Sequence, residues 1–261
     1  MTKYSIGIVT YVKRFEKFFK PLVLSLEKYF PRVEKNYVLN GFYDRAVQQD
    51  YLEKAREFLR GTSASNVVAY DENQSLSKCW NQLVLHSAAP KILIMNDDVE
   101  IGRLFKWCLE AQMRMFEAAV INKSWSHFFI SKNTIRQVGW FEERFPGVGH
   151  EDADYALRMA LAGGRKFIPR MFEHNIYCFG IHNIVAKNED PGWKQVSASI
   201  NNKYTSANSD FFDSKWESSP KPLEGGINAY GQKYMRIKPG METSMFYDFA
   251  LLDRPLKSPL I

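Results

Sequence analysis

The sequence predicts an α/β protein with a mostly parallel sheet flanked by helices, and three observations carry that prediction. Over the first ninety-five residues, short apolar runs alternate with longer amphipathic stretches, as in repeated strand–helix units. The most apolar run is followed at once by Asn96-Asp97-Asp98. Later, a loop with two glycines leads into the acidic helix start Glu151-Asp152-Ala153-Asp154. Because ligands of open α/β sheets gather at the carboxyl ends of strands, we expect the functional site there.

The first half of the chain supplies four expected strands and three helices between them. The strands fall at 5–10, 36–39, 66–69 and 91–95, and the helices at 15–29, 44–59 and 76–87. Pro31 ends the first helix and Gly61 closes the second. Pro21 lies inside the first helix and counts against a fully regular one.

The second half has a less regular pattern. It predicts a helix at 103–116, a strand at 126–131, and a helix at 151–162 that ends at Gly163-Gly164. Residues 191–261 mix aromatic, Lys, Asn and Gly residues with weak periodicity. We therefore expect one domain over 1–190 followed by an irregular carboxyl-terminal extension.

Composition sets broad limits on the class of protein. The 261 residues are 45% hydrophobic and 25% charged, which suits a globular domain and predicts neither a membrane span nor a signal peptide. The cysteines are few and widely spaced, which favours a reducing, cytoplasmic setting over a disulfide framework; peripheral membrane association is left open. A net charge of +6 favours polyanionic partners such as nucleotide phosphates, anionic lipid or nucleic acid.

The acidic cluster after the fourth strand has two interpretations. Two adjacent carboxylates at the end of a buried strand repel each other and lose solvation unless a cation or hydrogen-bond donors compensate them. A divalent metal ion would do so, because Mg²⁺ and Mn²⁺ commonly bridge carboxylates to substrate phosphates. Alternatively, Asp97 or Asp98 caps the helix that follows.

The helix start at Glu151 also has two interpretations. The helix macrodipole favours acids in a first turn, so helix stabilisation alone would account for them. The functional interpretation makes Asp152 a general base that takes the proton of an attacking hydroxyl, with Glu151 orienting it or holding the acceptor. Asp154 and Arg158 stand four residues apart and are expected to form a structural pair.

Two further segments complete an ordered set of motifs. Asn73-Gln74-Ser75-Leu76-Ser77-Lys78-Cys79-Trp80-Asn81 ends fifteen residues before the acidic cluster, and Phe141-Glu142-Glu143-Arg144-Phe145 precedes the glycine-bearing loop. With these motifs, the chain from about Lys3 to Gly164 resembles the family 2 glycosyltransferases, which have the GT-A fold. The first segment is similar to the family's Asn-x-Gly-x-x-x-Ala-x-Asn, with Ser75 in place of glycine. The second is similar to its Phe-Asp-Glu-x-Phe element.

The resemblance implies an enzyme that moves a sugar from a nucleotide diphosphate sugar, a UDP-sugar by default, to a hydroxyl of a glycan or lipid-linked saccharide. Residues 1–100 would form the nucleotide-sugar half and 101–190 the acceptor half. The extension, 191–261, would serve acceptor binding or oligomerisation, and a homo-oligomer is allowed. Asn96-Asp97-Asp98 stands where the family has its Asp-x-Asp motif, with Asn96 in place of the first acid.

The resemblance also assigns individual roles. Asp98 would hold Mn²⁺ or Mg²⁺, and His182, in preference to His174, would add a metal or diphosphate contact. Asp152, assisted by Glu151, would be the base of an inverting displacement. The nucleotide-sugar would be held by the strand ends and the segment before the acidic cluster: Thr10, Tyr11, Arg14, Asn73, Ser77, Asn81, Asn96 and Asp97.

Other classes of function are less favoured. A dinucleotide-dependent oxidoreductase or Rossmann-type methyltransferase should carry a glycine-rich turn directly after the first strand, where this chain has Thr10-Tyr11-Val12-Lys13-Arg14. A glycosyltransferase acting on DNA bases, or a non-catalytic nucleotide-sugar or nucleic-acid-binding module, stays open, because basic and aromatic residues interleave near the carboxyl end. These residues are Trp216, Lys221, Tyr230, Lys233, Tyr234, Arg236 and Lys238. An extension packed by its aromatic side chains is the simpler interpretation.

Overall fold

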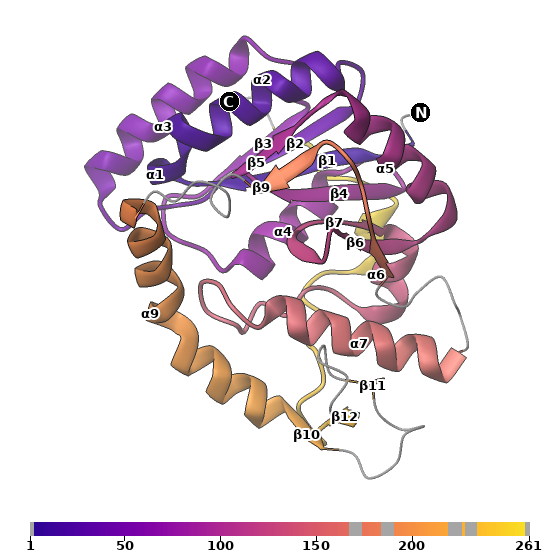
Figure 1. Cartoon of the computed structure of the whole chain (residues 1–261). Coiled ribbons are helices and arrows are strands. Elements are labelled where there is room, and N and C mark those ends of the chain that lie inside the picture. Colours follow the sequence, from indigo (N-terminus) through magenta and orange to yellow (C-terminus); the bar gives the residue numbers. More distant parts are fainter. Residues whose placement is uncertain (1–2, 167–173, 184–190, 219–225, 228–233, 259–261) are drawn as a thin grey trace.

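A seven-stranded sheet forms the centre of the molecule (Figure 1). The computed structural model describes residues 3–166, 174–183, 191–218, 226–227 and 234–258. The strand order is β3-β2-β1-β4-β7-β6-β8, and β7 runs antiparallel to β4 and β6 while the other neighbours are parallel. The strands are β1 (Ser5–Thr10), β2 (Glu34–Leu39), β3 (Asn66–Ala69), β4 (Lys91–Asn96), β6 (Ala118–Ile121), β7 (Ser124–Ser131) and β8 (His174–Ile176). The predicted α/β fold is confirmed.

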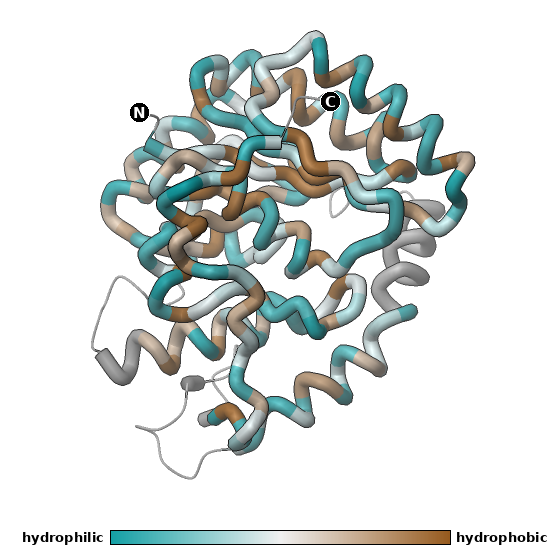
Figure 2. Tube along the Cα trace, turned by 180° about the vertical axis from the view of Figure 1, so that it is seen from behind, coloured by the Kyte–Doolittle hydropathy of each residue, from teal (hydrophilic) through white to brown (hydrophobic). Residues whose placement is uncertain are grey.

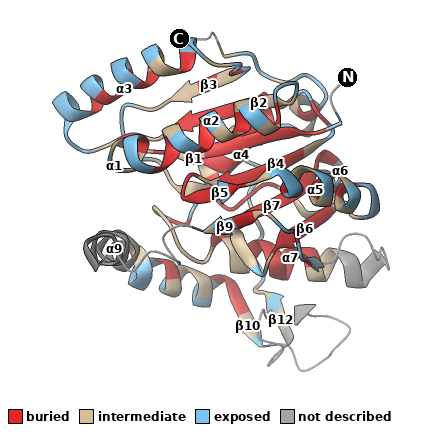
Figure 3. Cartoon of the chain, turned by 45° about the horizontal axis from the view of Figure 1, so that its top comes forward, coloured by how far each residue is buried: buried red, intermediate tan, exposed pale blue. Residues whose placement is uncertain are grey.

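Helices cover both faces of this sheet, and each face has its own hydrophobic core. One core is built with α2 (Lys20–Tyr29), α3 (Arg45–Arg60) and α5 (Arg103–Met115), and the other with α4 (Leu76–His86), α6 (Lys132–Val138) and α7 (Glu151–Lys166). Figure 2 shows hydrophobic residues concentrated in the inner strands, and Figure 3 shows the same strands as largely buried. Strands buried on two faces read as continuous apolar runs, which is why β1, β2, β3, β4 and β7 could be predicted; β6 and β8 were not predicted.

Side-chain caps fix where the helices begin. The Asp44 carboxylate accepts from the backbone N–H groups of Ala46 and Val47 at the start of α3. The Ser75 hydroxyl accepts from Lys78 N at the start of α4. Each cap satisfies an N–H that has no partner within the helix. These caps lie close to the predicted helix starts at 44 and 76.

The first helix is not regular, as Pro21 had suggested. It consists of α1 (Val12–Arg14), the π-helical turn η1 (Phe15–Phe19) and α2. Pro21 falls in the first turn of α2, where its missing N–H would lack an intrahelical partner anyway. The wider π-helical turn allows the chain to continue through the proline as one helical segment.

One predicted helix boundary needs correction, and one small sheet was not predicted. The helix expected to end at Gly163-Gly164 continues, because α7 extends through them to Lys166; a mid-helix glycine costs only about 1 kcal/mol relative to alanine. A two-stranded antiparallel sheet of β5 (Val99–Ile101) and β9 (Ile181–Asn183) was not predicted. Three residues are too few to show a period.

The expectation of an irregular extension is wrong for much of 191–261. The segment contains the long helix α9 (Pro191–Lys215) and a small antiparallel sheet of β10 (Trp216–Ser218), β11 (Gly226–Ile227) and β12 (Tyr234–Ile237), followed by the 3₁₀ turn η3 (Phe249–Leu252). α9 escaped prediction because its sequence is rich in Ser and Asn and lacks a sustained apolar stripe.

Buried contacts fasten this carboxyl-terminal segment to the rest of the chain. Lys215 Nζ lies 2.9 Å from Glu142 Oε2 and 2.7 Å from Asp154 Oδ1, and all three side chains are fully buried. Farther on, Lys132 Nζ donates to the Leu252 carbonyl, and Leu256 N donates to the Leu85 carbonyl. Residues 252–256 thus pack against α4 and α6. Within the described residues, none of the helices has the length and apolar content that crossing a bilayer requires.

Candidate functional site

The two acids after β4 are bound by an arginine from the first helix. Arg14 Nε lies 2.6 Å from Asp97 Oδ1, and an Arg14 terminal nitrogen lies 2.9 Å from Asp98 Oδ1. Both carboxylates are buried. From the sequence we expected a cation or hydrogen-bond donors to compensate these acids, with a divalent metal as the candidate cation; in the structure the Arg14 guanidinium supplies positive charge there. The predicted site residues Arg14, Asp97 and Asp98 are therefore brought together, and a simple helix-capping turn does not describe them.

Electrostatics at this cluster follow from burial. Burial raises the pKa of Asp97 to about 6, although the Arg14 charge and the Thr10 hydroxyl oppose the rise. Tyr11 is the residue before α1, and burial raises its pKa, while the charges of Arg14 and Asp97 act on it in opposite directions. Thr10 is buried at the end of β1. The carboxyl ends of β1 and β4 therefore meet at one polar site, as the parallel pairing of these strands requires.

The chemistry of this cluster fits a divalent cation. Asp97 Oδ2 is buried and accepts no hydrogen bond, and carboxylate oxygen is the ligand that Mg²⁺ and Mn²⁺ prefer. Among the described residues, no three His, Cys, Asp or Glu side chains are grouped to hold a metal by themselves. A metal here would take its remaining ligands from water or substrate phosphates, which is common for Mg²⁺. Asn96 ends β4 and is half-buried.

Three of the five histidines bear on this site. His182 is exposed on β9, in register with Glu100 of β5, the strand that directly follows Asp98. His174 begins β8, and its side chain lies outside the described set. His127, to which the sequence analysis gave no role, is buried on β7 opposite Met95, and neither ring nitrogen has a hydrogen-bond partner. Burial lowers the pKa of His127 to about 4, against the opposing charge of Asp98, so it is neutral at pH 7.

The second acidic constellation lies at the start of α7. Glu151 is buried and accepts a hydrogen bond from Gly149 N, and burial together with the Asp152 charge raises its pKa to about 8. Asp152 is half-buried and accepts from Ala153 N at 2.8 Å. Glu151 is therefore protonated at neutral pH, and of these two acids Asp152 is the more accessible.

The third acid of the first turn has a structural role, as predicted. Arg158 Nε lies 2.8 Å from Asp154 Oδ2, and both side chains are buried. Asp154 Oδ1 also accepts from the Trp216 indole at 3.0 Å. This acid is fully occupied in holding α7 against the carboxyl-terminal segment.

The loop 146–150 before α7 is held by α9. Asn208 is buried, and its Nδ2 donates to the carbonyls of Pro146 at 3.1 Å and Val148 at 2.9 Å. Gly147 has φ of +61°, and a Cβ there would lie 2.2 Å from the Tyr204 ring. The Gly147 carbonyl also accepts from Leu76 N at 2.7 Å. This bond places the loop beside the amino end of α4, so both constellations border the carboxyl edge of the sheet.

The segment 73–81 has mainly a supporting role. Asn81 is buried, donates to the Phe141 carbonyl and to Glu143 Oε1, and accepts from Phe141 N. Its hydrogen-bonding atoms are thus taken by the 141–145 element. Asn73 Nδ2 donates to the Gly41 carbonyl at 3.3 Å, and the buried Ser77 hydroxyl has no partner. Of these three predicted contacts, Ser77 is the one with a buried polar group that lacks a partner.

Trp216, one of the aromatic residues considered for nucleic-acid binding, does not lie on the surface. Trp216 is buried against Asp154 and is not available to stack on bases. Arg236 pairs with Glu217, and Lys238 donates to the Asp213 carbonyl. Tyr234 begins β12, and its side chain is outside the described set. Lys221, Tyr230 and Lys233 lie outside the described residues.

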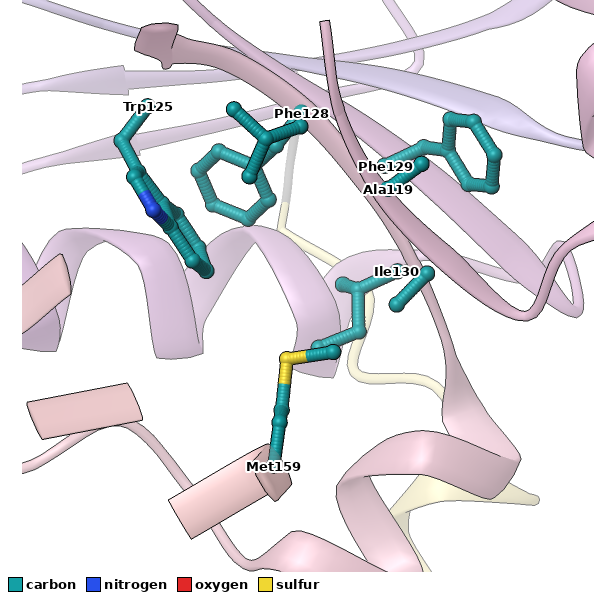
Figure 4. A pocket seen from close by; sticks show the side chains of 8 residues that line it. Ala119, Trp125, Phe128, Phe129, Ile130 and Met159 are labelled. Atoms are coloured by element: carbon teal, nitrogen blue, oxygen red, sulfur yellow. The ribbon is translucent and has the colours of Figure 1, made fainter. Parts of the chain in front are cut away.

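A small pocket between β6, β7 and α7 does not suit a nucleotide. Aromatic and aliphatic side chains line it, including Trp125, Phe128 and Met159 (Figure 4). A nucleoside diphosphate needs charged or polar partners for its phosphates. We interpret this pocket as a packing gap of the core.

Two structurally important residues escaped the sequence analysis. Asn208 and Lys215 lie on α9, between about sixty and seventy-three residues from their partners at 142–148. The sequence feature that could have indicated Lys215 is the presence of two acids, Glu142 and Asp154, among apolar neighbours, because buried acids need a cation. Local periodicity does not show which distant lysine neutralises them.

Comparison with known proteins gives matches among solved structures alone. Neither a family model nor a curated protein matches the chain. The chain is similar to S. aureus TarS 1–349, with 16% identity, a TM-score of 0.45, and coverage of 60% of this chain and 54% of that one. It is similar to the mannosyltransferase PcManGT from Pyrobaculum calidifontis in complex with GDP-Man and Mn²⁺, with 11% identity, a TM-score of 0.48, and coverage of 85% and 66%.

The chain therefore spans about half the length of the TarS structure. Likenesses of this degree carry no assignment of substrate or mechanism, which depend on the residues of this chain.

Proposed function

We propose that this chain is a metal-dependent, inverting glycosyltransferase that transfers a sugar from a nucleotide diphosphate sugar to a hydroxyl group. The observation that carries the proposal is the buried pair Asp97 and Asp98 bound by Arg14 at the carboxyl end of β4. The half-buried Asp152 at the start of α7 supplies the second requirement, a base near the same edge of the sheet. A cluster with a purely structural role would not need both a buried acid pair and a base.

The donor side of the site must stabilise negative charge on the departing diphosphate. Arg14 carries guanidinium N–H groups suited to phosphate oxygens, and Ser77 has an unpartnered hydroxyl. Asp98, with Asp97, would hold Mn²⁺ or Mg²⁺, which supplies Lewis-acid stabilisation of the diphosphate when bound. His182 stays a prediction as an additional contact, supported by its position beside β5.

The acceptor side needs one proton removed. In the proposed step the acceptor oxygen forms a bond to sugar C1, the bond from C1 to the phosphate oxygen breaks, and that electron pair leaves with the nucleoside diphosphate. Asp152 takes the acceptor's proton. Glu151 is already protonated at neutral pH, so it would position Asp152 or donate a hydrogen bond to the acceptor. One displacement inverts the anomeric centre.

The test is a panel of nucleotide sugars incubated with Mn²⁺ or Mg²⁺ and a set of saccharide acceptors, scored by release of nucleoside diphosphate. UDP-GlcNAc and GDP-mannose come first, because similar structures contain them. Release that requires a divalent ion supports the proposal. Binding of a donor without release under any condition would favour a non-catalytic module, and a salt-dependent shift of DNA would favour the nucleic-acid alternative. NMR of the product's anomeric configuration tests inversion.

A further inference from the structure

One face of the molecule exposes an unusual set of large apolar side chains. Leu104 and Trp107 lie on α5, and Tyr177 and Phe179 lie between β8 and β9; these four, which we name the α5 patch, are between 62% and 77% exposed. Scattered apolar side chains on a surface are ordinary, but a contiguous group marks an interaction surface. The four side chains form such a group only if α5 and the segment between β8 and β9 lie side by side.

Backbone contacts bring the two parts of the α5 patch together. Gly102 N donates to the Gly180 carbonyl at 2.7 Å at the start of α5. One turn and a half later, Cys108 Sγ donates to the Tyr177 carbonyl at 3.2 Å. The segment 177–180 therefore runs alongside the first half of α5, on the outside of the sheet (Figure 1). Leu104 and Trp107, three residues apart, share one helix face.

The charges around the α5 patch are mainly positive. Arg103 and Lys106 adjoin it along α5, where Lys106 Nζ also lies 5.9 Å from the centre of the buried Phe30 ring, and Lys123 Nζ lies 6.0 Å from the centre of the Tyr177 ring. None of the three forms an ion pair with any residue that the structure describes. Glu100, on β5, is the nearest exposed acid along the chain. Basic residues in a helix's first turn oppose its macrodipole, so helix stability does not account for Arg103 and Lys106.

We propose that the α5 patch binds the surface of an anionic lipid bilayer. Aromatic side chains with polar tips prefer the boundary between headgroups and acyl chains, and flanking basic residues are attracted to anionic headgroups. The net charge of +6 has the required sign. Because β5 connects Asp98 to the start of α5, docking on this patch places the edge of the proposed site beside the bilayer. The proposal does not depend on transferase activity.

The test is flotation of the full chain with vesicles of phosphatidylcholine alone or mixed with phosphatidylglycerol. Binding is expected to the mixed vesicles and to weaken at high salt. The double variant Trp107→Ser/Phe179→Ser should lose at least about tenfold in affinity, because two large aromatic side chains no longer enter the interface. Met245→Ser is the matched control, because Met245 is 70% exposed in the carboxyl-terminal segment.

A charge variant separates lipid binding from folding. Arg103→Glu/Lys106→Glu places acids where the helix macrodipole favours them, so Tm should hold or rise while binding to anionic vesicles is lost. Arg254→Glu/Lys257→Glu, which changes two exposed residues of the end segment, should leave binding unchanged. Equal affinity for neutral and anionic vesicles, or no affinity for either, would overturn the proposal. So would a concentration-dependent dimer that the Trp107 variant abolishes, because the occupant would then be a second copy.

Discussion

Arg14 Nε lies 2.6 Å from Asp97 Oδ1 across the carboxyl ends of β1 and β4. The same guanidinium reaches Asp98, so one cation serves two buried carboxylates. Removing one partner of a buried ion pair leaves an uncompensated charge, which costs far more than losing an exposed pair. Replacing Arg14 therefore tests both the stability of the fold and the binding of a metal cation by the two acids.

Arg14→Met is expected to lower the free energy of unfolding by about 3 kcal/mol, because two buried carboxylates lose their cation. Urea denaturation measures the change. Mn²⁺ should raise Tm more for the variant than for the parent, because a ligand that binds the folded state stabilises it.

Lys20→Met is the control for this prediction, because Lys20 pairs with Glu16 at the surface and its loss should cost at most about 1 kcal/mol. An equal, small loss in both variants would show that Asp97 and Asp98 do not need Arg14.

Lys215→Met should destabilise the protein by about 3–5 kcal/mol, because it leaves Glu142 and Asp154 buried without their shared cation. The measurement is again urea denaturation, with the exposed Lys54, paired to Asp50, changed to Met for comparison. A loss no larger than that of the Lys54 variant would mean that α9 and β10 are not joined to the domain through this cluster.

The free energy of unfolding of the Glu151→Gln variant, relative to that of the parent, should increase as pH rises from 5 to 8. The pKa of Glu151 is raised from 4.5 to about 8 in the folded protein, so across this window the folded state retains a proton that the unfolded state releases. Stability from this group therefore falls as pH rises. Glutamine cannot ionise, and its carbonyl can still accept from Gly149 N. A difference between variant and parent that stays constant from pH 5 to 8 would contradict the raised pKa.

Gly147→Ala should cost at least about 1 kcal/mol, because the position has a positive φ and the added Cβ would strike the Tyr204 ring. Thermal unfolding measures the loss. In the background of Tyr204→Ala the cost of Gly147→Ala should shrink but not vanish, since the φ requirement stays. An unchanged cost would show that α9 does not hold the 146–150 loop.

The sequence pattern was sufficient where the signal is local. β1 and β3 match the predicted bounds because continuous apolar runs end abruptly at polar residues, and Asp44 and Ser75 cap helices through contacts two or three residues away. The acid pair was located for the same reason. Its partner Arg14 was named as a site residue, but not as the cation that binds both acids.

Contacts between distant segments could not be read from periodicity. β5 meets β9 about eighty residues later, and each has three residues, so neither shows alternation. Lys215 and Asn208 act on segments more than fifty residues away. His127 looked like one polar residue in an apolar strand, and only the pairing of β7 with β4 places it near Asp98.

The central claim is that Asp98 helps to bind the nucleotide-sugar donor and that Asp152 acts as the base in sugar transfer. One measurement on the Asp152→Asn variant tests this claim most directly. Donor binding with Mn²⁺ is measured by calorimetry, and sugar transfer is measured on the same sample with the active donor from the panel. The account predicts donor affinity close to that of the parent and transfer reduced by at least about a hundredfold, the scale of general-base catalysis. Transfer at the parent's rate with donor binding intact would contradict the account.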